Sequence, residues 1–324
     1  MTCTRCFGTA SISGVLLSSV LLSAPTFAQD DADTVRFAVP AWPGVTVKTA
    51  LTAQLLEALG YEVRKQELGS TITYEAMNQG EIDAFMAAWL PAQNGMYETA
   101  MERGTIVDLG NNVDGARLGF AVPAYAYEAG FTSAEQFTND AFAERVNRTI
   151  YSIEVGSGMS DLLNAAVEDN VYGLSEWKLS ETSTPGMLSA AADAMSRNEW
   201  VVFAGWTPHW MNIEYDIEYL DDPENIWGEG GGRSDVKTLV TTEFSEENPN
   251  ATRLLDQITF TADDQSAMIY GFSYEEREPE QVALEWMRDN TERVQAFLNG
   301  VTTRNGEPGW QAVEQTLKLE KDES

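Results

Sequence analysis

The sequence predicts an α/β fold divided into two domains. Short runs of strand-forming residues alternate along the chain with stretches of helical periodicity, a pattern typical of sheets covered by helices. The chain has 324 residues, a length that favours two domains. Because 43% of the residues are hydrophobic and 10% are aromatic, we expect a large core despite a formal net charge of −31.

The first α/β unit starts near residue 35. Residues 35–39 have the composition of a strand, and apolar residues then recur at helical spacing from Val47 to Leu59 before Gly60 ends the helix. The rest of this unit is expected to be a strand, a helix and a strand over residues 61–68, 70–79 and 82–88.

A second alternation starts near residue 118 and ends in a mostly helical carboxy-terminal part. Its expected strands cover residues 118–122, 149–154, 177–181 and 200–205. Its expected helices cover residues 158–169 and 185–198, and Pro185 suits a first helical turn. Helices are also expected over residues 249–257, 262–270, 279–290 and 292–298.

The amino terminus has the order of a secretory signal peptide. A positive charge at Arg5 precedes an apolar run over residues 12–22, which is too short to span a membrane, and a small residue ends the segment at Ala28. Cleavage after Ala28 leaves 296 residues with a net charge of −32 and removes both cysteines, Cys3 and Cys6. We therefore expect an exported protein without cysteine.

Composition also excludes several kinds of function. A strongly acidic chain repels phosphate backbones, so no nucleic acid is expected as a partner, and no later apolar run reaches the roughly 20 residues of a membrane helix. A single histidine and no cysteine provide little material for acid–base catalysis or a metal centre, so neither a metal site nor a cofactor is expected. The acidic run over residues 221–224 is interpreted as a solvated turn, with a hard cation as the open alternative.

Three of the nine tryptophans share one position relative to the expected strands. Trp42 follows the first strand, Trp89 ends the third, and Trp206 follows the strand over residues 200–205, each beside a proline-containing turn. Ligands of α/β proteins bind beyond the carboxyl ends of strands, and indole faces attract organic cations. We therefore predict a cage between the two domains that binds a methylated cation. The other tryptophans considered are interpreted as structural: Trp177, Trp200, Trp227, Trp286 and Trp310.

Several motifs resemble those of a known family, the glycine betaine/choline-type substrate-binding proteins of ABC importers. The motifs are Leu59-Gly60-Tyr61, Thr73-Tyr74, Gly80-Glu81-Ile82-Asp83, Trp89-Leu90-Pro91, Ile153-Glu154 with a glycine-rich turn, and Gly205-Trp206-Thr207-Pro208-His209-Trp210-Met211. The resemblance extends from about residue 35 to residue 300. It implies a two-lobed periplasmic binding protein fold with the ligand cleft between the lobes, and Trp42, Trp89 and Trp206 match its cage positions.

The resemblance also implies a domain organisation and a partner. Residues 1–28 would be the signal peptide, residues 34–118 and 237–324 lobe I, and residues 119–236 lobe II. The expected partner in the membrane is the permease of an ABC importer, and the protein is expected to be a periplasmic monomer without enzymatic activity.

Three residues depart from the choline-type pattern. Gly44 replaces an acidic residue, Leu118 replaces a fourth aromatic wall, and Ser157 replaces an asparagine. Each change removes a group that would serve choline, so choline is disfavoured. The backbone N–H groups of Gly44-Val45 and of Gly158-Met159, at two expected helix starts, are suited to an anion.

A ligand with a cationic head and an anionic tail satisfies both ends of such a site, and glycine betaine is the ligand that we predict. Trimethylamine N-oxide, dimethylsulfoniopropionate, carnitine and choline remain alternatives. His209 is interpreted either as a donor to a ligand carboxylate or as a residue that locks its own loop. Glu154 either faces the pocket or has a capping or interdomain role, and Ser157 is a further polar candidate.

Two other classes of protein stay open. Ser157, between two glycines, and His209 are the elements of a conceivable hydrolase, but Val155 stands where a nucleophile elbow has its first glycine. An exported structural or adhesive protein is the other class, and it would not close around a ligand.

Overall fold

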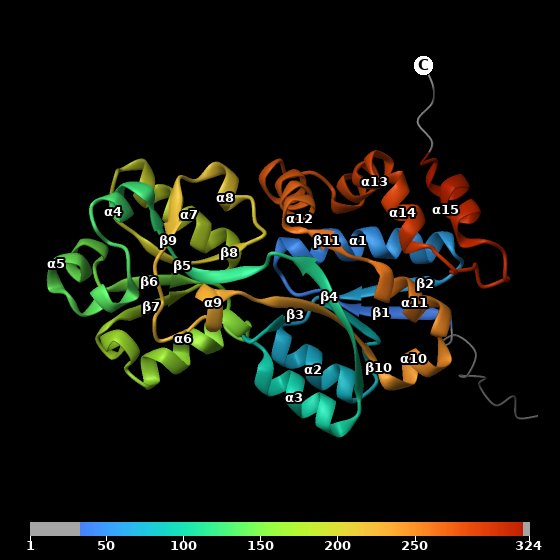
Figure 1. The fold of residues 1–324 in the computed structure, drawn as a ribbon, viewed down its shortest axis with the longest axis horizontal. Helices are drawn as coiled ribbons and strands as arrows, with labels where there is room; N and C mark the ends of the chain where they lie inside the picture. The colour runs from blue at the N-terminus through green and yellow to red at the C-terminus, as the bar shows by residue number, and fades with distance from the viewer. Residues whose placement is uncertain (1–32, 320–324) are drawn as a thin grey trace, which may run out of the picture. The chain divides into compact units, whose positions relative to one another are not determined.

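The computed structural model describes residues 33–319, which contain two β-sheets with helices on their faces (Figure 1). The predicted signal peptide over residues 1–28 lies outside the described residues. Among residues 33–319, no helix combines the length and the apolar composition needed to cross a membrane. The prediction of an α/β fold is confirmed.

The first sheet has six strands in the order β11-β4-β10-β3-β1-β2. Its strands are β1 Thr34–Ala38, β2 Glu62–Gln66, β3 Ala84–Leu90, β4 Ile106–Asp114, β10 Asp235–Thr241 and β11 Phe260–Thr261. β1 pairs in parallel with β2 and β3, which confirms the expected amino-terminal unit. β10 lies antiparallel between β3 and β4, so the chain returns to the middle of this sheet from the second one.

Helices cover both faces of the first sheet. In Figure 1, α1 lies on one face with α12 to α15, and α2 and α3 lie on the other. The amino-terminal helices are α1 Pro43–Ala58, α2 Ser70–Asn78 and α3 Asn94–Arg103. The carboxy-terminal helices are α10 Thr242–Glu247, α11 Pro249–Gln257, α12 Ala262–Ile269, α13 Pro279–Asp289, α14 Thr291–Phe297 and α15 Gly309–Leu317.

The second sheet has five strands in the order β7-β6-β8-β5-β9. Its strands are β5 Arg117–Pro123, β6 Thr149–Ser152, β7 Lys178–Glu181, β8 Val202–Thr207 and β9 Ile217–Tyr219. Its helices are α4 Ala124–Glu128, α5 Asp140–Ala143, α6 Gly158–Glu168, α7 Thr184–Ser196, α8 Met211–Glu214 and α9 Glu229–Gly232. β8 runs to Thr207, so Trp206 is part of the strand and does not follow it as expected.

The chain passes from the first sheet to the second between Asp114 and Arg117, and it returns just before Asp235. The two passages lie side by side, because Arg117 forms an antiparallel bridge with Arg233. We refer to the two halves as the first and second lobes. The passages fall close to the predicted lobe boundaries at residues 118 and 237, which remain a prediction.

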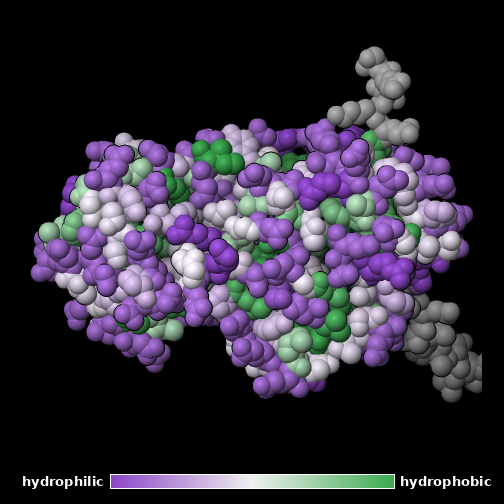
Figure 2. Space-filling view, viewed as in Figure 1, coloured by the Kyte–Doolittle hydropathy of each residue, from purple (hydrophilic) through white to green (hydrophobic). Residues whose placement is uncertain are grey.

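Aromatic packing supports each lobe. In the second lobe, the ring centroids of Phe137 and Trp177 lie 4.7 Å apart, and those of Phe120 and Trp227 lie 4.9 Å apart. In the first lobe, Trp286 packs edge to face on Phe260 at 5.4 Å. Such contacts stabilise a core by about 0.5–1.5 kcal/mol each beyond the burial of area. The face drawn in Figure 2 is mostly hydrophilic, with apolar residues in small separate patches.

Candidate functional site

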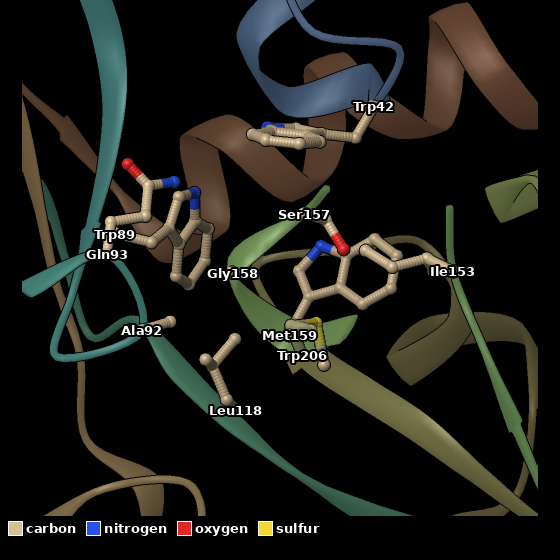
Figure 3. Close-up of a pocket in the computed structure, with 10 residues that line it drawn as sticks. All are labelled: Trp42, Trp89, Ala92, Gln93, Leu118, Ile153, Ser157, Gly158, Met159 and Trp206. Carbon is tan, nitrogen blue, oxygen red and sulfur yellow. The ribbon is translucent and has the colours of Figure 1, made fainter. Parts of the chain in front are cut away.

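A cavity between the two lobes brings the three predicted tryptophans together. Trp42 and Trp89 come from the first lobe and Trp206 from the second (Figure 3). The lining residues are Trp42, Trp89, Ala92, Gln93, Leu118, Ile153, Ser157, Gly158, Met159 and Trp206. None of these ten side chains carries a charge. We call this the tryptophan cavity.

Trp42 reaches the cavity from the amino end of α1. It is the N-cap residue, with extended backbone angles of φ −114° and ψ 146°, and Pro43 begins the helix. The Trp42 N–H donates to the carbonyl of Pro40 at 2.8 Å, which closes the preceding turn. A proline at the first helical position is favourable because its missing N–H has no partner there in any case. The turn and the helix start together fix the Trp42 backbone at the rim of the first lobe.

Trp89 and Trp206 are held by strand pairing. Trp89, in β3, lies opposite Val236 of β10, and Trp206, in β8, lies opposite Leu118 of β5. The pairing brings Leu118 into the cavity wall beside Trp206. Trp206 is 5% exposed, whereas Trp89 is half-buried. Leu118 therefore gives the cavity an apolar wall beside Trp206.

The amino end of α6 supplies the polar part of the cavity. Gly158 is the first residue of this 11-residue helix, and Ser157 caps it by accepting a hydrogen bond from the Ser160 N–H at 3.2 Å. The first N–H groups of a helix have no partner within it and lie at the positive end of its dipole. Gly158 and Met159 both line the cavity, so this end is suited to a negatively charged ligand group.

Gly44 and Val45, the other backbone candidates, are not among the residues that line the cavity. The Gly44 carbonyl accepts a hydrogen bond from Gln265 Nε2 at 2.7 Å, and Val45 is 1% exposed. Both residues lie in the first turn of α1, behind Trp42. A ligand role for them stays a prediction.

His209 lies next to the cavity and is fully buried. Its ring meets that of Trp206 edge to face, with centroids 4.7 Å apart, and its Nδ1 accepts a hydrogen bond from the Met211 N–H at 3.1 Å. Nδ1 is thus an acceptor, and the neutral ring carries its proton on Nε2. Burial lowers the pKa of His209 to about 3, so the imidazole is uncharged at neutral pH.

Glu154 follows β6 but does not line the cavity. Burial is the main cause of the raised pKa of its carboxyl group, the charge of Glu67 adds to the rise, and neither carboxyl oxygen has a hydrogen-bond partner within residues 33–319. The N-cap of α7 is Ser183, whose hydroxyl oxygen accepts a hydrogen bond from the Gly186 N–H at 3.3 Å, so Glu154 does not cap this helix. A ligand role for Glu154 stays a prediction.

Sequence reasoning missed Gln93, which lines the cavity four residues after Trp89. Its amide Nε2 donates to Ser70 Oγ and to the Ala87 carbonyl at 3.2 Å each, and its Oε1 accepts from the Tyr74 hydroxyl at 3.2 Å. The amide therefore ties β3 to α2. The signal available in the sequence was a polar residue just past the Trp89-Leu90-Pro91 turn.

Within the acidic run over residues 221–224, Asp222 has a structural role. Asp222 accepts hydrogen bonds from the Tyr172 hydroxyl at 2.8 Å and from the Trp227 N–H at 2.9 Å. Within residues 33–319, no group of three or more His, Cys, Asp or Glu side chains is arranged to hold a metal ion.

Two α/β lobes with an uncharged, tryptophan-walled cavity between them define a binding protein for a small solute. The family comparison names the kind of solute-binding protein. Residues 33–289 match the family described as the substrate binding domain of ABC-type glycine betaine transport systems, and the chain belongs to that family.

Individual relatives agree with this assignment. The chain is 31% identical over 178 residues to the glycine betaine/carnitine transport binding protein GbuC of Listeria monocytogenes, an alignment that covers 55% of this chain and 58% of that protein. It resembles an ABC-transporter choline binding protein in complex with choline, with a TM-score of 0.85 and 29% identity over 89% of this chain and 99% of the other. Lactococcal OpuAC, closed on glycine betaine, gives a TM-score of 0.73 and 28% identity over 82% and 99% of the chains.

Proposed function

We propose that the chain is the periplasmic substrate-binding protein of an ABC importer, and that it captures glycine betaine in the tryptophan cavity. The observation that carries the proposal is the meeting of three indoles with the amino end of α6 in one uncharged cavity. The trimethylammonium head would lie among Trp42, Trp89 and Trp206. The carboxylate would accept hydrogen bonds from the backbone N–H groups of Gly158 and Met159.

The energetics are consistent with transport. A quaternary ammonium group has no N–H to satisfy, and each desolvated indole contributes about 1–2 kcal/mol through cation–π attraction. Three indoles and the carboxylate contacts together reach roughly 8 kcal/mol, which corresponds to a micromolar dissociation constant. Affinity of this order allows capture from dilute solution and later release to a permease.

The walls of the cavity favour glycine betaine over choline. Choline ends in a hydroxyl group and has no anionic end to use the α6 amino terminus. Near that terminus, Ser157 uses its hydroxyl oxygen to cap the helix, and Leu118 offers only an apolar surface. Both solutes occur among the ligands of the relatives described above, so the discrimination depends on these residues of the chain.

Isothermal titration with glycine betaine, trimethylamine N-oxide, dimethylsulfoniopropionate, carnitine and choline, measured side by side, tests the proposal. We expect micromolar binding of glycine betaine and at least tenfold weaker binding of choline. Stronger binding of trimethylamine N-oxide than of glycine betaine would move the assignment to the smaller ligand. Failure of all five ligands to bind would refute the proposal.

We also propose that Ser157 and His209 have no catalytic role. Ser157 caps α6, and the Nδ1 of His209 is occupied by the backbone of its own loop. A Ser157→Ala variant should retain glycine betaine binding within a few-fold of the original. Release of a hydrolysis product from an ester of choline by the original protein, but not by the variant, would support the hydrolase alternative.

A further inference from the structure

A second contact joins the lobes outside the tryptophan cavity. Trp210 of the second lobe, just before α8, donates from Nε1 to Ser273 Oγ of the first lobe at 3.1 Å. Its ring also packs on Tyr274, with centroids 5.0 Å apart. Ser273 and Tyr274 belong to the π-helical turn Tyr270–Tyr274, which follows α12. Figure 1 shows α8 and α12 facing each other at the boundary between the lobes.

A carboxylate of the second lobe extends this contact. Glu214, at the end of α8, lies close enough to Tyr270 and Tyr274 to raise the pKa of both hydroxyl groups. The interaction with Glu214 is the main cause of the raised pKa of Tyr274, and for Tyr270 it adds to the effect of burial. We call Trp210, Glu214, Tyr270, Ser273 and Tyr274 the latch. None of the five lines the tryptophan cavity.

The latch is connected to the cavity by contacts between rings. The ring of His209 lies 4.7 Å from that of Trp206 and 5.3 Å from that of Trp210, so the buried imidazole is packed between the two indoles. Asn212 Nδ2 donates to the carbonyls of Trp206 and His209 at 2.8 and 3.1 Å. These contacts tie the segment from Trp206 to Asn212 together, with a cavity wall at one end and the latch near the other.

We propose that Trp210 is a positioning residue that couples occupancy of the tryptophan cavity to retention of the ligand. The latch contacts join opposite lobes, so they form only when the lobes are together, and they stabilise that state without touching the ligand. Loss of the latch contacts should leave the rate of ligand association with the open protein unchanged and should increase the rate of ligand dissociation. This inference rests on the function proposed above.

Dissociation kinetics test the latch. Isotope-labelled glycine betaine is bound to the full chain and chased with unlabelled ligand for the original protein, Trp210→Phe, Ser273→Ala and the double variant. Either single change removes the bond between the indole and the hydroxyl, so we expect dissociation to be about fivefold faster with the association rate unchanged. The double variant should match the single ones, because both changes remove the same bond.

Trp310→Phe, in α15 of the first lobe and away from the latch, is the matched control and should dissociate at the original rate. Ser273→Ala leaves every aromatic ring of the latch in place, so this variant still tests the latch even if Trp210→Phe folds poorly. Unchanged dissociation rates in both single variants, with normal binding by the original protein, would overturn the latch and leave the proposed function standing. Absence of binding by the original protein would instead count against the proposed function.

Discussion

Gly158 at the start of α6 and Ala92 after β3 come from opposite lobes and approach so closely that no side chain fits between them. A β-carbon at position 158 would lie 2.9 Å from both the Cβ and the carbonyl oxygen of Ala92. Real β-carbons essentially never come this close to another atom, and the neighbour here is partly backbone. The glycine therefore permits the contact of the two lobes at the floor of the cavity.

Gly158→Ala should weaken glycine betaine binding about a hundredfold and leave the stability of the unliganded protein nearly unchanged. The added methyl group keeps the lobes apart, whereas an alanine is well tolerated within the helix itself. Titration calorimetry and thermal unfolding measure the two effects. Gly95→Ala in α3, where a β-carbon meets nothing within 4 Å, is the control and should bind normally. Normal binding by Gly158→Ala would show that the bound state does not bring these residues together.

Removing a cavity indole should affect affinity more than stability. Trp89→Ala is expected to weaken glycine betaine binding at least tens-fold, because a cation–π surface is lost, and Trp206→Ala should do the same with an added loss of stability because Trp206 is 5% exposed. Trp286 does not line the cavity and packs on Phe260, so Trp286→Ala should lower the free energy of unfolding by about 3–5 kcal/mol with unchanged affinity. Small and equal changes in affinity for all three variants would contradict the cage.

The buried His209 should make the protein less stable as the pH falls below 6.5. The unfolded chain takes up a proton near its ordinary pKa of 6.5, but the folded pKa is about 3, so folding excludes that proton between these values. The expected loss is about 1.4 kcal/mol per pH unit within this range. Ligand affinity should not titrate near pH 6.5, since the imidazole stays neutral in the folded state.

Urea unfolding of the original protein and of His209→Asn at pH 7.5 and pH 5.5 isolates this effect. Asparagine keeps an acceptor near the Met211 N–H but has no group that titrates in this range. The variant should lose less stability on acidification than the original protein. Equal losses would show that His209 is protonated in the folded state.

The buried Lys48 should make the free energy of unfolding depend on pH above pH 7. It is fully buried in α1, donates to Asn112 Oδ1 at 2.6 Å, and burial lowers its pKa to about 7 from 10.5. Since the unfolded chain holds the proton up to pH 10.5, the stability contribution of the neutral amine is lost as the pH falls from 10.5 towards 7. Unfolding measured between pH 7 and pH 9.5 should show stability that increases with pH.

Lys48→Met should flatten this dependence and raise stability at pH 7, because no amine then has to lose its proton on burial. Lys65→Met is the control, since Lys65 forms an exposed ion pair with Glu280 and should leave the pH dependence unchanged. A variant with the same pH dependence as the original protein would mean that Lys48 remains charged when buried.

Local signals in the sequence were sufficient to predict that the three tryptophans lie at or near strand ends. Each signal is a strand end next to a proline turn, and both features depend on residues within a few positions of the indole. The expectation failed in detail for Trp206, which is inside β8 because the pairing with β5 extends to Thr207. Strand ends depend on the neighbouring strand, and a local pattern does not contain that partner.

Contacts between distant segments were not predicted either, because a local pattern does not contain the distant partner. The lobe boundary predicted at residue 237 falls within β10, which lies between β3 and β4 in the first sheet. Lys48 has a residue type that is almost never fully buried, and no local pattern marks it as an exception. It is buried because the sheet lies on one side of α1 and the carboxy-terminal helices α12 and α13 pack on the other.

The sequence by itself determined the class of fold and the chemistry of the cavity walls, because periodicity, proline turns and the choice of tryptophan are properties of short segments. Tertiary structure decided which candidates share one cavity. Ser157, Gly158 and Met159 line it with the indoles, while Gly44, Val45, Glu154 and His209 do not. It also decided the approach of Gly158 to Ala92 and the position of the latch. Both depend on how two lobes pack, and packing joins residues that are far apart in the chain.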